Sequence, residues 1–273
     1  AEIREKAKKQ LKSKLASANS ESAPRLPPGV TTIANESMPD KTPDRFTVYF
    51  ETTKGPFAVE FTRDWAPTGA DRMYELVLKK FFTDMRVFRV VENFVVQFGI
   101  SGDPDVSKQW KKSNIADDPP AQSNTEGMFT FAAGGAPNTR STQVFINLGN
   151  NSRLDRMGFA PVGKVIFGMD VVKSLYAGYG ESITNLQDTI AAAGNGFLDK
   201  EFPKLDSIKR AVFVEQIKDL NAVEQHMRDE RLKQLEDVAE GKTARGTSER
   251  APGTFTAKFE CTMGTFVVEC TRE

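Results

Sequence analysis

Two segments of this chain carry the side chains best suited to chemistry: RVFRVVENFVVQFG at 86–99 and MFTFAAGGAPNTRSTQVFINL at 128–148. Each alternates apolar and polar residues around a few aromatic rings, which is typical of a strand on a half-buried sheet. On neighbouring strands they would bring together one cation, two amides and two aromatic rings, from Arg89, Gln97, Gln143, Phe94 and Phe145. This set predicts a shallow apolar pocket with the cation and the amides at its rim.

The residue types that most catalytic sites use are scarce. The single histidine, His226, lies in a charged stretch with helical periodicity, which argues against a histidine-based triad or a histidine-rich metal site. The loop GGAPNTRST at 134–142 lacks the Gly-Lys-Ser/Thr ending of a phosphate-binding loop. We therefore expect no metal ion and no cofactor.

The composition sets further bounds. The chain has 273 residues, of which 39% are hydrophobic, enough for one well-cored domain with extensions. Lys+Arg and Asp+Glu both number 37, and this zero formal net charge argues against nucleic acid as a partner. Without a run of about 18 apolar residues, no membrane span is expected. Cys261 and Cys270 give no disulfide framework. The initial alanine predicts either a removed leader or a fragment, and the expected compartment is the cytoplasm or an organelle, plastid or mitochondrion.

Residues 46–215 have the pattern of a β domain. Eight short strands are predicted, two in FTVYFETTKGPFAVEFT from Phe46 and the others near 86–91, 94–100, 128–133, 143–148, 160–166 and 207–214. Helices are predicted at 66–82 and 168–177, with a long polar loop at 101–127. Many short strands with few helices indicate a mainly β fold, an eight-stranded closed antiparallel barrel capped by two helices.

Extensions flank this domain at both ends. Residues 1–45 are predicted to hold a basic helix at 1–16, followed by a Pro/Ser-rich linker. The helix would serve as a docking helix, as the remainder of a targeting segment, or as a plain solvated helix. Residues 216–252 are predicted to form an amphipathic helix and a linker. Its apolar stripe needs a partner, either elsewhere in this chain or on a different protein.

The C-terminal segment repeats the first hairpin of the barrel. TFTAKFECTMGTFVVECTRE at 254–273 aligns without gaps to RFTVYFETTKGPFAVEFTRD at 45–64, with eleven of twenty positions identical. We interpret residues 253–273 as the start of a second copy of the domain in a longer precursor. The alternative is a hairpin that pairs with another chain or with this one, because an isolated hairpin is only marginally stable.

Three stretches resemble the cyclophilins: VFRVVENFVVQFG at 87–99, FAAGGAPNTRSTQVFI at 131–146 and RLDRMGFAPVGKVIFGMDVV at 153–172. The resemblance runs through nearly all of 46–215 in matching order and spacing, and is nearer to the bacterial and protist forms. It implies a peptidyl-prolyl cis–trans isomerase, which assists folding by rotating X–Pro bonds in proline-containing peptides or proteins. Such an enzyme forms no bond to a substrate atom, so it needs no nucleophile.

The resemblance also implies roles for the pocket residues. Arg89 would be the catalytic cation, and Gln97 would hold it. The other substrate-binding positions would be the proline seat of Phe94, Phe145 and Leu154, the pocket residues Val95 and Phe159, and Gln143 with the backbone of Ala133 and Gly134. Without the resemblance, a strand Phe is ordinarily core packing, and a strand Arg or Gln is ordinarily solvated.

Several positions depart from the cyclophilin pattern. Arg153 stands where many members have the Trp that donates a hydrogen bond to cyclosporin, so weak binding of that drug is expected. Phe88 and Phe159 stand where His is usual, Gly134 where Asn is usual, and Val95 where Met is common.

Two functions are therefore weighed. The retained Arg89 set favours an active prolyl isomerase. The extensions favour a structural subunit of a larger assembly, docked through the terminal helices and the C-terminal hairpin, with a weak or unused isomerase site. The two functions can coexist.

Overall fold

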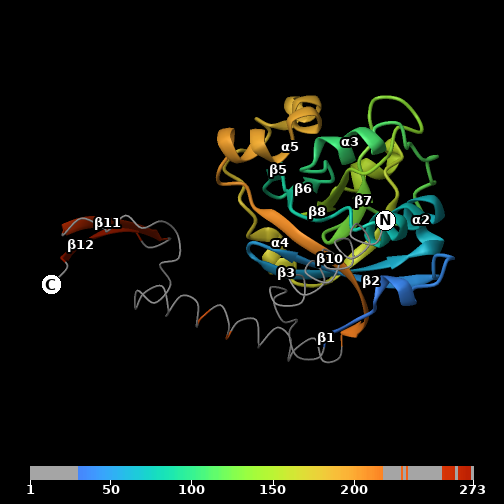
Figure 1. Cartoon of the computed structure of the whole chain (residues 1–273), viewed down its shortest axis with the longest axis horizontal. Helices are drawn as coiled ribbons and strands as arrows, with labels where there is room; N and C mark the ends of the chain where they lie inside the picture. Colours follow the sequence, from blue (N-terminus) through green and yellow to red (C-terminus); the bar gives the residue numbers. More distant parts are fainter. Residues whose placement is uncertain (1–29, 218–228, 230–231, 233–253, 262–263, 272–273) are drawn as a thin grey trace, which may run out of the picture. The chain divides into compact units, whose positions relative to one another are not determined.

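The computed structural model describes residues 30–217, 229, 232, 254–261 and 264–271 (Figure 1). The chain divides into two compact units, 1–228 and 229–273, which we describe separately. The basic helix predicted at 1–16 lies outside the described residues, as does nearly all of the amphipathic helix predicted at 216–252. Of that helix only Asp229 and Leu232 are described, and both are helical.

Ten antiparallel strands form one sheet, in the order β1-β10-β2-β3-β9-β7-β8-β6-β5, with β4 paired to β10. The strands are β1 (Val30–Thr32), β2 (Arg45–Thr52), β3 (Gly55–Thr62), β4 (Met85–Arg86), β5 (Arg89–Val91), β6 (Val95–Phe98), β7 (Met128–Phe131), β8 (Val144–Asn147), β9 (Pro161–Phe167) and β10 (Ser207–Ile217). The prediction of a mainly β, antiparallel fold is confirmed.

The sequence predicts a closed barrel, but within residues 30–217 the hydrogen-bonded ladder of strands does not close into a ring. β5 pairs with β6, whereas β4 pairs with β10, and only two residues separate β4 from β5. The strand predicted at 86–91 is thus two short strands, because the chain changes partner at this point. The tenth strand, β1, lies in the predicted linker and pairs with the end of β10, Val30 lying opposite Ile217.

Within residues 30–217, four α-helices accompany the sheet: α2 (Pro67–Leu78), α3 (Pro104–Trp110), α4 (Met169–Lys173) and α5 (Gln187–Glu201). Four short 3-10 helices join them: η1 (Asn35–Ser37), η2 (Arg63–Trp65), η3 (Ser152–Met157) and η4 (Thr184–Leu186). α2 and α4 were predicted. α3 lies within the predicted polar loop, and α5 lies in a stretch without a predicted element. The sequence analysis therefore predicted two of these four α-helices and missed the other two.

A polar residue from the long loop fixes the start of α2. The backbone N–H groups of Thr68 and Gly69 donate to the Asp118 carboxylate at 3.1 and 2.8 Å. The first N–H groups of a helix lack partners within the helix, so this carboxylate replaces a local cap. Asp118 lies in the polar loop predicted at 101–127, and it ties that loop to the helix.

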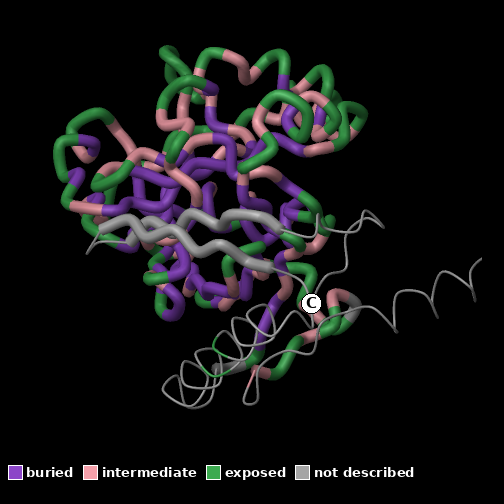
Figure 2. Tube along the Cα trace, turned by 90° about the vertical axis from the view of Figure 1, so that its left-hand side faces the viewer, coloured by how far each residue is buried: buried purple, intermediate pink, exposed green. Residues whose placement is uncertain are grey.

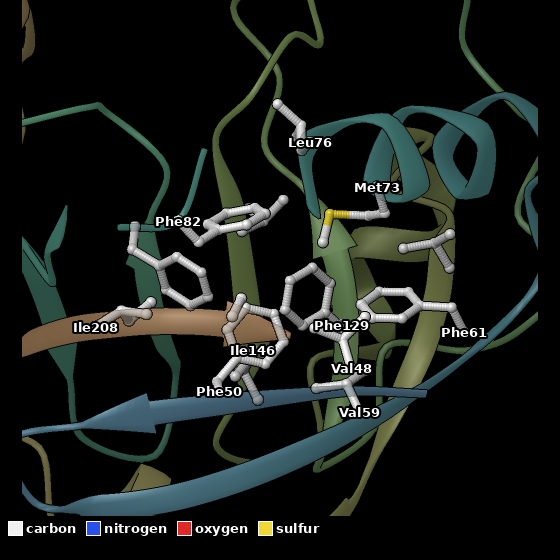
Figure 3. Packing of buried hydrophobic residues seen from close by; sticks show 14 of the residues in the cluster. Val48, Phe50, Val59, Phe61, Met73, Leu76, Phe82, Phe129, Ile146 and Ile208 are labelled. Atoms are coloured by element: carbon white, nitrogen blue, oxygen red, sulfur yellow. The ribbon is translucent and has the colours of Figure 1, made fainter. Parts of the chain in front are cut away.

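The core is a set of phenylalanine rings enclosed by the sheet and covered by α2. Phe50 and Phe57 stack with ring centroids 4.8 Å apart, and Phe129 meets Phe61 edge to face at 5.1 Å. Figure 2 shows the buried residues gathered in the strands, and Figure 3 shows Met73 of α2 among the rings. Offset and edge-to-face ring pairs add to the free energy gained by burial.

The second unit contains the C-terminal hairpin, β11 (Thr254–Cys261) and β12 (Gly264–Thr271). Thr254 pairs with Thr271 and Cys261 with Gly264, just as Arg45 pairs with Thr62 and Thr52 with Gly55 in the barrel. Every pair of the second hairpin is therefore the corresponding pair of the first, moved by 209 residues. This shared register supports the interpretation that 254–271 repeats the β2–β3 unit. The start of a second complete copy stays a prediction.

Candidate active site

The predicted cation and its amide partner face each other across two strands. Arg89 of β5 lies directly opposite Gln97 of β6 in the sheet register. Its Nη1 donates a hydrogen bond to Gln97 Oε1 at 2.8 Å, while Gln97 is almost fully buried. A guanidinium can only donate, so the amide oxygen of Gln97 has to face it. The strand pairing therefore brings together the two residues that the sequence proposed as partners.

The third strand of the site adds the second amide. β8 pairs with β6, and Phe145 lies opposite Gln97. Gln143, just before β8, accepts a hydrogen bond at its Oε1 from Gln97 Nε2 at 3.0 Å. Arg89, Gln97 and Gln143 thus form one chain of side-chain hydrogen bonds across three strands.

The predicted proline seat is a separate apolar cluster beside this chain. Its buried members are Val95, Phe145 and Leu154, and Phe94, Ala132 and Phe159 pack against them. The rings of Phe145 and Phe159 meet edge to face at 5.7 Å. Ala132, which directly follows β7, was not among the predicted pocket residues. The structure therefore brings every predicted apolar residue into one cluster.

The predicted backbone positions lie in the loop after β7. Ala133 is half-buried and Gly134 is exposed. The N–H of Ala132 still donates to Gln143 O at 2.9 Å, which extends the strand pairing by one residue. The N–H of Gly134 donates to Thr139 Oγ1 at 2.8 Å. That N–H is therefore directed into its own loop, and a substrate contact through it would have to replace the bond to Thr139.

Two departures from the cyclophilin pattern have visible consequences. Arg153 is exposed, and its guanidinium carbon lies 4.7 Å from the centroid of the Phe94 ring, whereas that of Arg89 lies at 5.4 Å. At the rim of the seat, the Phe94 ring therefore contacts two guanidinium groups, because such cations are attracted to aromatic faces. Phe88 is buried away from the seat, in an apolar cluster with Ile183 and Ile190.

The buried amide of Asn124, which the sequence analysis did not include in the site, supports the apolar seat through hydrogen bonds. Asn124 is fully buried, and its Nδ2 donates to Asp155 Oδ1 and to the Phe159 carbonyl, both at 2.8 Å. Asp155 also accepts a hydrogen bond from Ser123 Oγ at 2.5 Å. Asp155 is the neighbour of Leu154 in η3, so this network connects the backbone at two members of the seat, Leu154 and Phe159. Asn124 lies 31 positions or more from Asp155 and Phe159, and no local pattern links them.

The Asp155 network is expected to make stability depend on pH. Burial acts to raise the pKa of Asp155, but hydrogen bonds from Ser123 and Asn124 outweigh it and hold the pKa below its usual range. A lowered folded-state pKa contributes stability above the unfolded-state pKa, and this contribution is lost as the pH falls through the folded-state pKa. Asp155→Ala is therefore expected to lower the free energy of unfolding by about 1–3 kcal/mol at neutral pH.

Urea unfolding followed by circular dichroism, at neutral pH and below the Asp155 pKa, would measure this loss. The difference between wild type and Asp155→Ala should shrink at acid pH, where the carboxylate is protonated. The exposed Asp40 provides the control, and Asp40→Ala should change little at either pH. An Asp155→Ala effect of equal size at both pH values would contradict the expectation.

Two further residues contact this site and were missed by the sequence analysis. Glu181 bonds to Arg89, and Gln187, at the start of α5, bonds to Gln143. They lie in a stretch with no predicted element, and 92 residues separate Glu181 from Arg89. No pattern in the sequence pairs them with the site.

The chemistry available here is binding and hydrogen bonding. Among the described residues, no group of three or more His, Cys, Asp or Glu side chains is placed to hold a metal ion. In the same part of the chain, no helix has the length and apolar character needed to cross a membrane. Fold and site together define a β-barrel protein with a cation at the edge of an apolar seat, suited to holding a peptide.

Comparison with known proteins identifies the family. Residues 47–195 match the family described as cyclophilin type peptidyl-prolyl cis-trans isomerase/CLD. The chain belongs to the cyclophilin family.

Two relatives agree with this assignment. The chain is 30% identical to a peptidyl-prolyl cis-trans isomerase of Arabidopsis thaliana over 144 residues, which are 51% of this chain and 84% of that protein. It is 25% identical to peptidyl-prolyl cis-trans isomerase B of Escherichia coli, over 61% of this chain and 98% of that protein. A solved cyclophilin type isomerase from Cryptosporidium parvum is similar with a TM-score of 0.47 and 17% identity, over 63% of this chain and 99% of that chain.

Proposed function

We propose that this cyclophilin isomerises X–Pro peptide bonds at the pocket around Arg89, with the residues there in the roles that the family resemblance implies. The observation that carries the proposal is the guanidinium of Arg89, held by Gln97 at 2.8 Å beside the apolar cluster of Phe145 and Leu154. Nothing in the described part of the chain favours the alternative of a structural subunit.

Rotation about an X–Pro bond requires the loss of amide resonance, with a barrier of about 18–20 kcal/mol. In the twisted state the prolyl nitrogen becomes pyramidal and gains a lone pair. A donor aimed at that lone pair binds the twisted amide more strongly than the planar one, and only such a difference accelerates the reaction. Arg89 suits this role because a guanidinium presents several N–H donors and no acceptor.

One donor does not account for the whole rate. Removing a single preorganised donor costs roughly 3–4 kcal/mol in other enzymes. The remaining contribution is assigned to the apolar seat, where Phe145 and Leu154 would hold the proline ring while the carbonyl side turns. Gln143 and the backbone of Ala133 would hold the preceding residues in strand-like fashion. Assembly through the terminal helices and the C-terminal hairpin stays a prediction.

Exchange spectroscopy by NMR tests the proposal directly. Added in catalytic amount to a peptide with one Ala-Pro bond, the wild-type chain should produce exchange cross-peaks between the cis and trans forms. The uncatalysed reaction is too slow to produce them, since it takes tens to hundreds of seconds. A peptide spectrum that the protein leaves unchanged would contradict the proposal.

A variant of the seat locates the activity. Phe145→Ala removes the ring that lies opposite Gln97, and burial of such a ring is worth about 1.5–3 kcal/mol. Peptide binding should therefore weaken by about 10–100-fold. Unchanged binding would place the proline ring elsewhere.

A further inference from the structure

The chain between α4 and β10 packs directly on the strands that carry the catalytic cation. We define the α5 segment as residues 178–206, which contain η4 and α5. Five buried residues join it to the barrel in one apolar cluster: Ile183, Ile190, Leu198, Phe88 and Ile100. Phe88 immediately precedes Arg89, and Ile100 follows β6 by two residues. The segment therefore rests on both strands that build the site.

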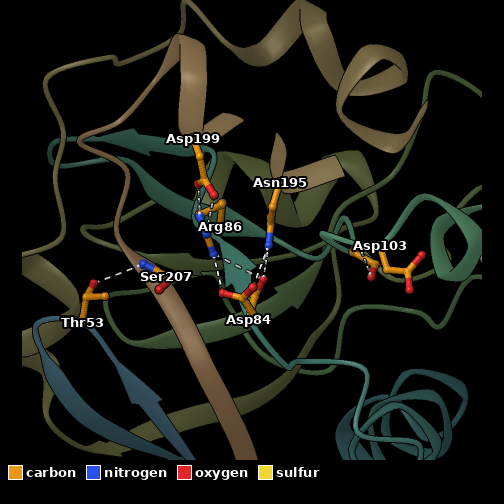
Figure 4. Close-up of polar contacts among 8 residues, drawn as sticks. Thr53, Asp84, Arg86, Asp103, Asn195, Asp199 and Ser207 are labelled. Atoms are coloured by element: carbon orange, nitrogen blue, oxygen red, sulfur yellow. Dashed lines mark hydrogen bonds and ion pairs between the residues drawn. The ribbon is translucent and has the colours of Figure 1, made fainter. Parts of the chain in front are cut away.

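Polar contacts fix the far side of the α5 segment to the barrel (Figure 4). Arg86 of β4 donates from Nε and Nη2 to the Asp199 carboxylate, at 2.7 and 2.9 Å. Asn195 Nδ2 donates to the Asp84 carbonyl at 2.7 Å. The backbone N–H of Asn195 donates to the Gly102 carbonyl at 2.9 Å. A paired guanidinium and carboxylate in this two-point geometry hold their partners in one orientation.

A glycine makes this attachment possible. α5 is interrupted at Gly194, whose φ of 64° and ψ of −155° are not helical. A Cβ atom at this position would lie 2.2 Å from the carbonyl oxygen of Gly102. Only glycine adopts this conformation at this approach without strain. The close approach of Gly194 to Gly102 therefore fixes the position of the α5 segment relative to the chain after β6.

At its near end the segment places a carboxylate on the catalytic cation. Glu181 accepts hydrogen bonds from Arg89 Nε at 2.8 Å and from Arg89 Nη2 at 2.6 Å. Thr184 Oγ1 donates to the same carboxylate at 2.8 Å. The hydrogen bonds from Arg89 hold the pKa of Glu181 below its usual range, so the carboxylate is charged at neutral pH.

This arrangement orients the guanidinium without occupying all of it. Arginine has five N–H groups. The contacts to Glu181 and Gln97 use three of those of Arg89, and they engage two different edges of its plane. Two N–H groups remain for a substrate amide, one on each terminal nitrogen. Glu181 thus fixes the direction in which the free N–H groups point.

The α5 segment also holds the opposite end of the polar chain. Gln187 Oε1 accepts a hydrogen bond from Gln143 Nε2 at 2.9 Å. Gln143 Oε1 in turn accepts from Gln97, whose own Oε1 accepts from Arg89. The series therefore begins and ends on the α5 segment, at Glu181 and at Gln187. Each amide has its oxygen directed toward the cation end.

We propose that Glu181 is a positioning residue of the isomerase site, which holds the Arg89 guanidinium in the orientation that a twisted amide requires. The proposal rests on the proposed function, because it assigns the purpose of the contact to that reaction. Arginine side chains lose up to about 2 kcal/mol of conformational entropy when fixed. A carboxylate that fixes the side chain beforehand removes this cost from the reaction.

The kinetic test compares variants at Glu181. Glu181→Ala should lower kcat by about 10-fold, because the entropy cost of fixing the Arg89 side chain would then fall on the reaction, with KM changed less than about twofold. Glu181→Gln keeps one acceptor and should recover part of the rate. Asp188→Asn is the matched control, since its side chain is 99% exposed on the same segment, and it should match wild type. A Glu181→Ala rate equal to or above that of wild type would overturn the proposal, the latter because the carboxylate would then be inhibitory.

A spectroscopic readout separates this proposal from the proposed function. The Nε–H resonance of Arg89 should be protected from solvent exchange in wild type and in Asp188→Asn, and lost in Glu181→Ala. This measurement needs no activity. A protected resonance in a chain without isomerase activity would refute the proposed function while leaving the pairing in place. A resonance that stays protected in Glu181→Ala would refute the role of Glu181.

Discussion

Replacing Arg89 by alanine is expected to lower kcat/KM for a prolyl peptide by about 10²–10³-fold, the loss usual for a single preorganised donor. The guanidinium lies at the rim of the apolar cluster, with its side chain 17% exposed and two N–H groups free of described partners. Alanine removes the only cation that Gln97 contacts in the described structure. Arg89→Lys keeps the charge but loses the planar fork, so it should recover little of the rate.

Exchange NMR or a protease-coupled assay would measure the loss. Arg45→Ala is the control for a missing arginine, because that side chain is 69% exposed on β2. It should have the activity of wild type. The free energy of unfolding of Arg89→Ala should also stay within about 1 kcal/mol of that of wild type, because the Glu181 partner of the ion pair is 55% exposed and such pairs contribute little. Equal activity of wild type and Arg89→Ala would disprove the assignment of the site.

Replacing Phe50 by alanine is expected to lower the free energy of unfolding by about 3–5 kcal/mol. Phe50 is fully buried and stacks on Phe57 at 4.8 Å. Its ring also meets those of Phe82 at 5.6 Å and Phe98 at 6.2 Å. Alanine leaves a cavity between rings from two strands and from the chain after α2, and the close-packed surroundings collapse only partly. Since a domain of this kind has about 5–15 kcal/mol in total, much of its stability is at risk.

Urea unfolding would show this as a lower midpoint at an unchanged slope. Phe50→Leu keeps most of the volume and should cost less. Met157→Ala, at a side chain 65% exposed, should lie within about 0.5 kcal/mol of wild type. A Phe50→Ala midpoint close to that of Met157→Ala would show that the rings do not form the stabilising core.

The strands and their partners were predictable to different degrees. The alternation around Phe46 and Val95 marks strands because the side-chain period of a strand is local. β1 was missed because Val30 is a strand residue only through its pairing with β10. α3 carries a readable start, with Asp103 accepting from the Asp105 N–H and Pro104 following it. α5 is hidden because its sequence breaks at Gly194, which only the contact with Gly102 explains.

The site divides in the same way. The sequence by itself determined which residues face the pocket, because Arg89, Gln97 and Phe145 follow from strand period and from a resemblance carried by contiguous motifs. Gln97 was predicted to hold Arg89, and only the tertiary structure decided which further residues support the site. Asn124 supports the seat and Glu181 holds the cation, and both act across separations of 31 and 92 residues. Local patterns report the direction of a side chain, whereas a hydrogen-bond partner is set by how distant segments pack, so these residues became visible only in the folded chain.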